Sequence, residues 1–165
     1  MEGVLARYHV SGALVSVSVP GDDGWKQSFG YADLAARKPF DPASFGSIRS
    51  VTKSFTVTVI LQLVRDQVLR LDDRLDQFIP GIPNGDRITL ADLAGMQSGI
   101  ADYSAQQAFQ EDFGSNPERS FTQAELVAYA SPASPVFAPG DQYQYSNTNT
   151  VLLGMVIEKV TGQAL

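Results

Sequence analysis

The stretch FGSIRSVTKSFTVTVILQLVRDQVLRLDD, residues 45–73, decides how this chain folds. Within it, the apolar side chains of residues 55–59 alternate with threonines, which by period alone indicates a β-strand. Residues 51–70, however, contain neither glycine nor proline, and an uninterrupted run of that length exceeds a usual strand. Length therefore favours a mostly buried helix with Ser50 as its N-cap. Its β-branched content means that tertiary packing must hold it.

The start of this predicted helix carries an S-x-x-K sequence, from Ser50 to Lys53. Residues three apart lie on one face of a helix, so the lysine amine is within reach of the serine hydroxyl. The hydroxyl is a weak nucleophile until a base takes its proton, and a buried lysine can be that base because burial disfavours its charged form. The helix N-terminus adds N–H groups that suit a developing oxyanion. In a plainer interpretation, Ser50 is only a cap and Lys53 a solvated residue.

A second motif, Tyr145-Ser146-Asn147, is a Y-x-N sequence far downstream. Residues i and i+2 of an extended segment point the same way, so a tyrosine that relays protons and an asparagine that binds a substrate amide can face one site. Alternatively, Asn147 or Thr148 caps the last helix while Tyr145 packs beside it. Each motif occurs once, in this order, and together they are far more specific than either alone. The candidate site residues are therefore Ser50, Lys53, Tyr145 and Asn147.

The rest of the chain consists of short elements separated by turn residues. Residues 13–31 are typical of a β-hairpin around Pro20 to Gly24, and residues 32–49 of a loop. The other predicted elements are a turn with a short helical piece over 71–82, a short helix over 88–93 capped by Thr89, a loop over 97–120, a helix over 122–130 with a Thr122/Glu125 capping box, and a final helix over 148–160 closed by Gly162. Two strands followed by helices indicate an α+β protein.

The composition is that of an ordinary globular protein and argues against several function classes. The chain has 165 residues and a net charge of −6, from 12 basic and 18 acidic residues, with no Lys/Arg cluster that would suggest nucleic-acid binding. It contains no cysteine, no metal-ligand spacing and no glycine-rich phosphate loop, so we expect no disulfide, metal or cofactor. We also expect no membrane span and no signal peptide, because no apolar run approaches ~20 residues and the N-terminus lacks a basic start.

Other serine hydrolase patterns are weak in this sequence. G-x-S-x-G, the strand-turn-helix motif that exposes a serine nucleophile, is absent. His9 is the only histidine, so a Ser-His-Asp triad would depend wholly on it. A hydrolase hypothesis therefore depends on S-x-x-K together with Y-x-N.

Three segments resemble a known family of serine hydrolases. Residues 45–73 resemble the nucleophile helix of the serine hydrolase family of D-alanyl-D-alanine carboxypeptidases, class C β-lactamases, penicillin-binding-protein-like enzymes and related esterases. Residues 88–103, ITLADLAGMQSGIADY, resemble its helix and Ser-Gly-Leu-type loop, and residues 139–163, PGDQYQYSNTNTVLLGMVIEKVTGQ, resemble its Tyr-x-Asn loop and the next helix. The resemblance covers about residues 10–165 and is closest to the D,D-carboxypeptidase branch.

This resemblance implies a role for each candidate residue. Ser50 would be acylated by the substrate, Lys53 would activate it, Tyr145 would shuttle protons, and Asn147 would hold the substrate's amide. The implied substrate is a D-Ala-D-Ala peptide, a β-lactam or an ester, handled without a cofactor. The alternatives are an esterase on the same scaffold and a non-catalytic fragment with a binding or structural role.

The resemblance also implies a serine β-lactamase/D,D-peptidase-like fold. Residues 1–45 would be the N-terminal part of the α/β sheet domain, and residues 46–165 the nucleophile helix and helical domain. The family's K-T-G or H-x-G motif lies on later strands that this sequence lacks, and residues 159–162, KVTG, do not match it. We therefore expect the hairpin edge to take up a complementing chain or to self-associate. A D,D-peptidase or β-lactamase would work in the cell envelope, in the periplasm or as a secreted protein.

Overall fold

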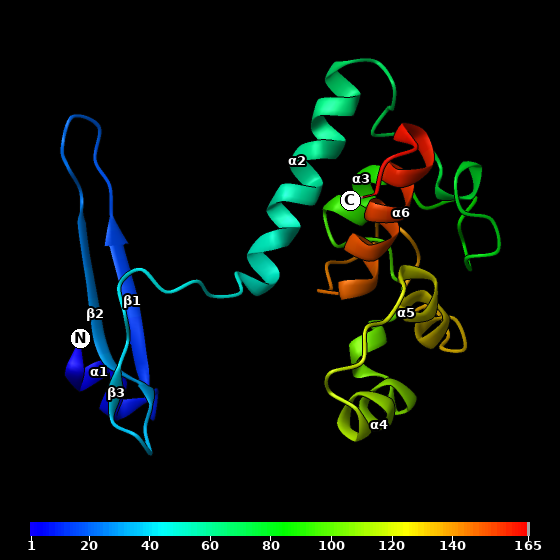
Figure 1. Cartoon of the computed structure of the whole chain (residues 1–165). Helices are drawn as coiled ribbons and strands as arrows, with labels where there is room; N and C mark the ends of the chain where they lie inside the picture. Colours follow the sequence, from blue (N-terminus) through cyan, green and yellow to red (C-terminus); the bar gives the residue numbers. More distant parts are fainter. Residues whose placement is uncertain (165) are drawn as a thin grey trace. The chain divides into compact units, whose positions relative to one another are not determined.

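The computed structural model describes residues 1–164 and divides into two compact units. The first unit is Met1–Ile48, and the second begins at Arg49. Figure 1 shows the sheet in the first unit and helices α2 to α6 in the second. All four candidate site residues belong to the second unit.

The first unit combines one short helix with a three-stranded antiparallel sheet in the order β1-β2-β3. Its elements are α1 Glu2–Arg7, β1 Gly12–Val17, β2 Trp25–Asp33 and β3 Lys38–Pro39. The pairing of β1 with β2 runs from Gly12 opposite Gly30 to Val17 opposite Trp25, which confirms the predicted hairpin. The loop predicted over 32–49 is wrong at β3, because a two-residue strand is too short to show a period in the sequence.

The second unit is helical. Its α-helices are α2 Thr52–Arg65, α3 Leu90–Ala94, α4 Gln107–Ser115, α5 Gln123–Ala130 and α6 Asn147–Thr161, with single 3-10 turns η1 Arg49–Val51, η2 Leu75–Gln77 and η3 Tyr103–Ala105. The predicted helix cap at Thr89 and the predicted capping box at Thr122 are confirmed, because each hydroxyl accepts a hydrogen bond from the backbone N–H three residues on. At Thr89 the structure adds the reciprocal bond, which the Thr89 N–H donates to the Asp92 side chain, so that this cap is also a capping box. Gly162 closes α6 with a left-handed φ of 69°, as predicted.

Helix α2 is shorter at both ends than its sequence predicts. Ser50 is not its N-cap, because it lies inside η1, and Val51 takes the N-cap position without a side-chain hydrogen bond. At the other end the helix stops at Arg65, and Gln67 adopts a left-handed φ of 60°. The chain can then reverse and bring Leu69 into the core, where its side chain is 2% exposed. Burial of that leucine therefore outweighs continuation of the helix.

Residues 97–120, predicted as a loop, contain η3 and α4. The ring of Phe109 is in contact with four other aromatic rings, with centroid separations of 5.0 to 5.8 Å. These rings belong to Tyr103, Phe113, Phe121 and Tyr129. Aromatic pairs of this kind contribute about 0.5–1.5 kcal/mol each beyond the area they bury. Tertiary contacts, rather than helical propensity in a polar segment, thus stabilise α4.

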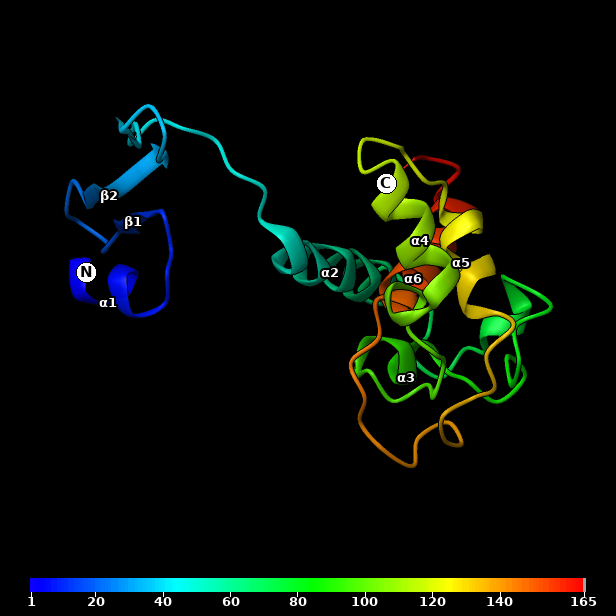
Figure 2. The same cartoon turned by 90° about the horizontal axis from the view of Figure 1, so that it is seen from below.

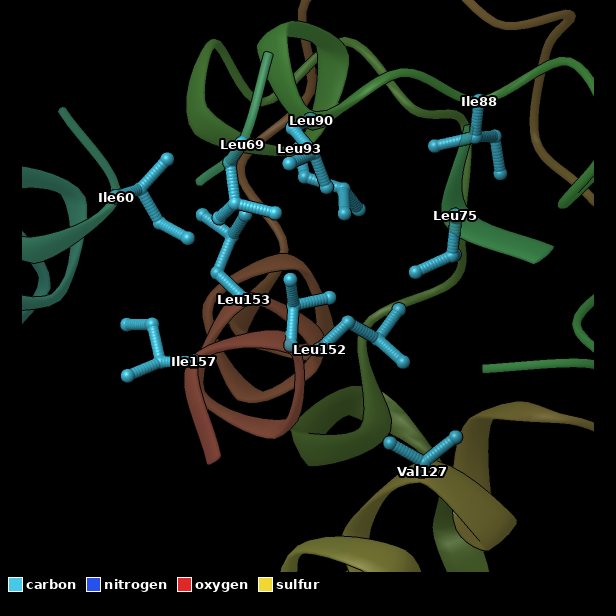
Figure 3. Packing of buried hydrophobic residues seen from close by; sticks show 11 residues of the cluster. Ile60, Leu69, Leu75, Ile88, Leu90, Leu93, Val127, Leu152, Leu153 and Ile157 are labelled. Carbon is cyan, nitrogen blue, oxygen red and sulfur yellow. The ribbon is translucent and has the colours of Figure 1, made fainter. Parts of the chain in front are cut away.

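Helix α6 lies at the centre of the second unit, among α2, α3 and α5 (Figures 1 and 2). The apolar cluster around it is shown in Figure 3 and consists of Ile60, Leu69, Leu75, Ile88, Leu90, Leu93, Val127, Leu152, Leu153, Val156 and Ile157. Full burial of one such side chain stabilises the fold by about 1.5–3 kcal/mol. This core fixes α2 against α6, and the candidate site residues lie at the N-terminal ends of those two helices.

Candidate active site

Ser50 and Lys53 lie one turn apart at the entrance to α2. Ser50 is the central residue of η1 and is exposed, whereas Lys53 is in the first turn of α2 and is half-buried. The Lys53 Nζ donates a hydrogen bond to Ser50 Oγ over 3.2 Å. Ser50 was predicted to be the N-cap of the helix, with its hydroxyl within reach of the Lys53 amine. The 3-10 turn gives the same result, since it points the hydroxyl and the amine toward each other.

Tyr145 contacts the same serine, although it lies far from Ser50 in the sequence. It belongs to the extended segment just before α6, and its hydroxyl donates to Ser50 Oγ over 2.9 Å. The Lys53 ammonium also lies 5.0 Å from the centroid of the Tyr145 ring. The structure thus brings the S-x-x-K and Y-x-N motifs together around one serine oxygen, with Lys53 and Tyr145 both able to exchange a proton with it.

The electrostatics of this cluster act on the tyrosine. The neighbouring Lys53, followed by the hydrogen bond with Ser50, favours the phenolate and lowers the pKa of Tyr145 below its ordinary value. Partial burial and the carboxylate of Asp102 act in the opposite direction but are weaker. A phenol with a lowered pKa is a better proton acceptor near neutral pH than an ordinary tyrosine.

Asn147 is the first residue of α6 and completes the cluster. Its Oδ1 accepts a hydrogen bond from the Tyr145 hydroxyl over 3.3 Å. Its Nδ2 donates to the two carboxylate oxygens of Asp102, over 3.3 and 3.1 Å, and to Ser104 Oγ over 3.0 Å. The asparagine is therefore held between the tyrosine and a polar turn from another part of the chain.

Sequence reasoning missed Asp102 and Ser104. Their local signal was present, since Asp102 caps η3 by accepting a hydrogen bond from the Ser104 N–H over 3.0 Å. Their contact with Asn147 spans more than forty residues of sequence and has no periodic signature. The segment that resembles the family, residues 88–103, ended inside this turn and so pointed to the right place.

The turn that carries Asp102 is tied to the start of α6 by buried side chains. Thr148 is 0% exposed, and its hydroxyl donates to the Ala101 carbonyl over 2.7 Å and accepts from the Tyr103 N–H over 3.0 Å. One residue on, the buried Asn149 accepts a hydrogen bond from the Ser98 hydroxyl. Because unmade hydrogen bonds in a buried place cost about 1–3 kcal/mol each, these contacts hold the turn against α6.

An open depression of ≈ 220 Å³ adjoins the cluster. Its lining comes from Arg49, Thr52, Lys53, Tyr103, Gln123, Asn147, Thr150, Val151 and Gly154. Burial, more than any neighbouring charge, raises the pKa of Tyr103, so this phenol stays protonated at the edge of the site. Across residues 1–164 the structure has no group of histidine, cysteine and acidic side chains suited to a metal ion. No helix in the same residues is long and apolar enough to cross a membrane.

Comparison with known proteins gives the family of the chain. The family model described as Beta-lactamase matches residues 1–165. Penicillin-binding protein 4* of Bacillus subtilis is 29% identical over 97% of this chain, and a D-aminopeptidase of Brucella canis is 34% identical over 96%. The chain spans 35% of the length of the first relative and 30% of the second.

Solved structures agree with this assignment. A D-stereospecific amidohydrolase from a Streptomyces species superimposes with a TM-score of 0.83 and 35% identity, over 93% of this chain and 46% of its own. The predicted resemblance and the predicted α+β, penicillin-binding-protein-like fold are both confirmed. The chain belongs to the beta-lactamase family of serine hydrolases, which includes penicillin-binding proteins and D-aminopeptidases.

Proposed function

We propose that the protein is a serine hydrolase in which Ser50 forms an acyl-enzyme with the substrate. The observation that carries this proposal is that Ser50 Oγ receives hydrogen bonds from both Lys53 Nζ and the Tyr145 hydroxyl. An exposed serine with two proton-exchanging partners is the arrangement that an activated nucleophile needs. The remaining residues of the cluster, Asn147 and Asp102, then face the substrate or support the groups that do.

The chemistry follows from these contacts. Lys53 takes the proton of the Ser50 hydroxyl as Oγ attacks the substrate carbonyl carbon, and a new C–O bond forms. Tyr145 relays that proton to the leaving group as the bond between the carbonyl carbon and the leaving nitrogen or oxygen breaks. Water then attacks the carbonyl carbon of the ester at Ser50, and its oxygen forms a new C–O bond as the bond between that carbon and Ser50 Oγ breaks. One proton of this water passes along the same pair of side chains to the serine oxygen, and the acid leaves. The lowered pKa of Tyr145 supports this relay, because the phenol can both give and accept a proton.

The relatives narrow the substrates that this site is proposed to cleave. A D-aminopeptidase of Brucella canis and a D-stereospecific amidohydrolase of a Streptomyces species are among them, and so is a penicillin-binding protein of Bacillus subtilis. These names favour an amide bond beside a residue of D configuration as the bond that is cleaved. The substrate that contains this bond would be a peptide or a β-lactam. Simple esters on the same scaffold are expected to react as well, because their leaving group needs less protonation.

The test uses the full-length protein and a fluorescent fluorophosphonate. We expect one label per molecule, mapped to the peptide that contains Ser50, and no label in Ser50→Ala. The matched control is Ser54→Ala, an exposed serine of α2 four residues further along the chain, which should label normally. If the Ser50→Ala variant is still labelled, another residue is the nucleophile and the proposal is wrong.

A further inference from the structure

The loop that carries Tyr145 is paired by its backbone with residues 96–99, which follow α3. The N–H of Gln144, the residue before Tyr145, donates a hydrogen bond to the Met96 carbonyl over 2.9 Å. Two further N–H donors earlier in this loop bond carbonyls of the same segment, also over 2.9 Å. The contact of the Tyr145 hydroxyl with Ser50 therefore depends on where residues 96–99 are held.

Met96 is held from its other side by a buried side chain of α6. Its sulfur accepts a hydrogen bond from Asn149 Nδ2 over 3.3 Å, and Asn149 is 1% exposed. The Ser98 hydroxyl donates to Oδ1 of the same amide, which leaves Nδ2 as the end that faces the sulfur. Met96 also has a left-handed φ of 58°, which residues other than glycine rarely adopt unless their surroundings impose it. The thioether and the carbonyl of one residue thus link α6 to the loop of Tyr145.

From this arrangement we propose that Met96 is a modification site, at which oxidation of the thioether to the sulfoxide slows the acylation of Ser50. The inference rests on the proposed function, because its effect passes through Tyr145. Hydrogen peroxide is the oxidant: its O–O bond breaks, one oxygen forms the S–O bond, and the other leaves as water with both hydrogens. The sulfur is thereby oxidised by two electrons and the peroxide is reduced, and a methionine sulfoxide reductase reverses the change.

The added oxygen changes the size and the polarity of the side chain in a packed place. The new S–O group lies where the sulfur meets the buried Asn149. The backbone of Met96 is fixed at both of its polar groups, since its N–H donates to a carbonyl of α3 and its carbonyl accepts from Gln144. Because packed interiors leave no room for one more oxygen, residues 96–99 move away from α6 and take the loop of Tyr145 with them.

The composition of the chain makes this modification easy to isolate. Its 165 residues include three methionines and no cysteine, so methionine is the side chain that peroxide oxidises first. Met155 is the matched control, because it is partly buried like Met96 but packs against the apolar cluster about two turns along α6 from Asn147. Met1 is 51% exposed and belongs to the first unit, so it reports oxidation remote from the cluster.

The experiment treats the full-length protein with increasing hydrogen peroxide and then with the fluorophosphonate. Peptide mapping gives the fraction of each methionine that has gained an oxygen, and fluorescence gives the rate of labelling at Ser50. We expect this rate to fall about tenfold as Met96 is oxidised, the effect of about one lost hydrogen bond, and a methionine sulfoxide reductase to restore it. The ratio of rates before and after peroxide should approach one in Met96→Leu and stay at the wild-type value in Met155→Leu.

Several outcomes would overturn the inference. They are a loss of labelling that follows Met1 or Met155, a loss that persists in Met96→Leu, an unchanged rate after full oxidation of Met96, a Met96 that stays reduced when Met1 is fully oxidised, and unfolding of the oxidised protein by circular dichroism. If Met96→Leu does not fold, the wild type decides, because brief labelling of half-oxidised protein should leave the sulfoxide depleted in the labelled fraction. Absence of label at Ser50 before any peroxide would instead overturn the serine hydrolase itself.

Discussion

The two units of the chain differ in how many of their apolar side chains they bury. In residues 1–48, all of them described by the structure, Leu5 is the only buried apolar side chain, whereas the second unit buries the cluster of Figure 3. The large apolar side chains that the first unit leaves exposed are Met1, Val4, Tyr8, Val10, Leu14, Val17, Val19, Trp25, Leu34, Phe45 and Ile48. By itself the first unit depends mainly on backbone pairing, which is marginal for so small a sheet.

This difference explains where the candidate site lies. Hydrolytic chemistry requires side chains held close to one geometry, and only a packed support can do that. Ser50 and Lys53 lie just before and in the first turn of α2, which carries Ile60. Tyr145 and Asn147 lie just before and at the first residue of α6, which carries Leu152, and both of these apolar residues are 0% exposed. The geometry of the site is therefore expected to depend on the second unit's core.

The largest expected effect is on the rate of labelling, and it tests whether a residue of the second unit can be essential for the reaction without contributing to the core. Lys53→Ala removes the proposed base, so the rate of labelling at Ser50 should fall by about 10²–10⁴-fold, the usual contribution of such a group. Urea unfolding should change little, because Lys53 is outside the apolar core. The matched control is Lys159→Ala, an exposed lysine at the end of α6. Near-normal labelling in Lys53→Ala would mean that Tyr145, and not Lys53, is the base.

The next effect tests the contrast between the units directly. Leu152→Ala leaves a cavity beside α6 and should lower the free energy of unfolding by about 2–5 kcal/mol. Val17→Ala, at a side chain that is 51% exposed in β1, should change it by less than about 0.5 kcal/mol. Urea titration followed by circular dichroism measures both, with Leu152→Met as a milder core variant. Equal losses at the two positions would mean that the sheet is buried in solution and the contrast is not real.

The same contrast separates what the sequence predicts from what it does not. The helix cap at Thr89, the capping box at Thr122 and the C-cap at Gly162 are predictable because each depends on residues a few positions apart. Helix α4 was missed because distant aromatic rings hold it, and Ser50 was misplaced because a 3-10 turn precedes α2. Secondary structure fixed by local contacts is readable from the sequence, and structure fixed across the core is not.

The candidate site follows the same rule. Ser50, Lys53, Tyr145 and Asn147 could be chosen because two short motifs and their order are visible in the sequence. Asp102 reaches Asn147 only through the fold, since the turn that carries it is positioned by the buried Thr148. The residues of the motifs were therefore predictable, and the groups that set their orientation were not.

A smaller effect is expected from a helix end in the second unit. Thr122→Ala removes the hydroxyl that accepts from the Glu125 N–H at the start of α5, and should cost about 1 kcal/mol of unfolding free energy. Thr122→Ser keeps the acceptor and should recover most of that loss. Both are measured by urea titration beside Leu152→Ala. If Thr122→Ser is as unstable as Thr122→Ala, the methyl group rather than the cap holds this helix.

The smallest effect concerns pH and the one tyrosine at the centre of the cluster. Lys53 and Ser50 lower the pKa of Tyr145 in the folded protein, whereas an unfolded tyrosine titrates near 10. A lowered pKa means that the folded state favours the phenolate, so this stabilisation is fully present above about pH 10 and is lost as the pH falls through the folded pKa. Since Tyr145 is 43% exposed, solvent screens the effect on stability, and the rate of labelling is the better measurement.

The expected dependence of the labelling rate on pH follows from the lowered pKa of Tyr145. In the proposed relay Lys53 passes the Ser50 proton on to Tyr145, so labelling should rise with pH as the Tyr145 phenolate forms and should level off below about pH 10. Lys53→Ala removes the largest cause of the lowered pKa and should move this limb to higher pH, besides lowering the plateau. Tyr145→Phe should abolish the limb, and Tyr143→Phe, two residues away and 68% exposed, should leave it unchanged. A limb that persists in Tyr145→Phe belongs to another group, and the proton relay would then have to bypass this tyrosine.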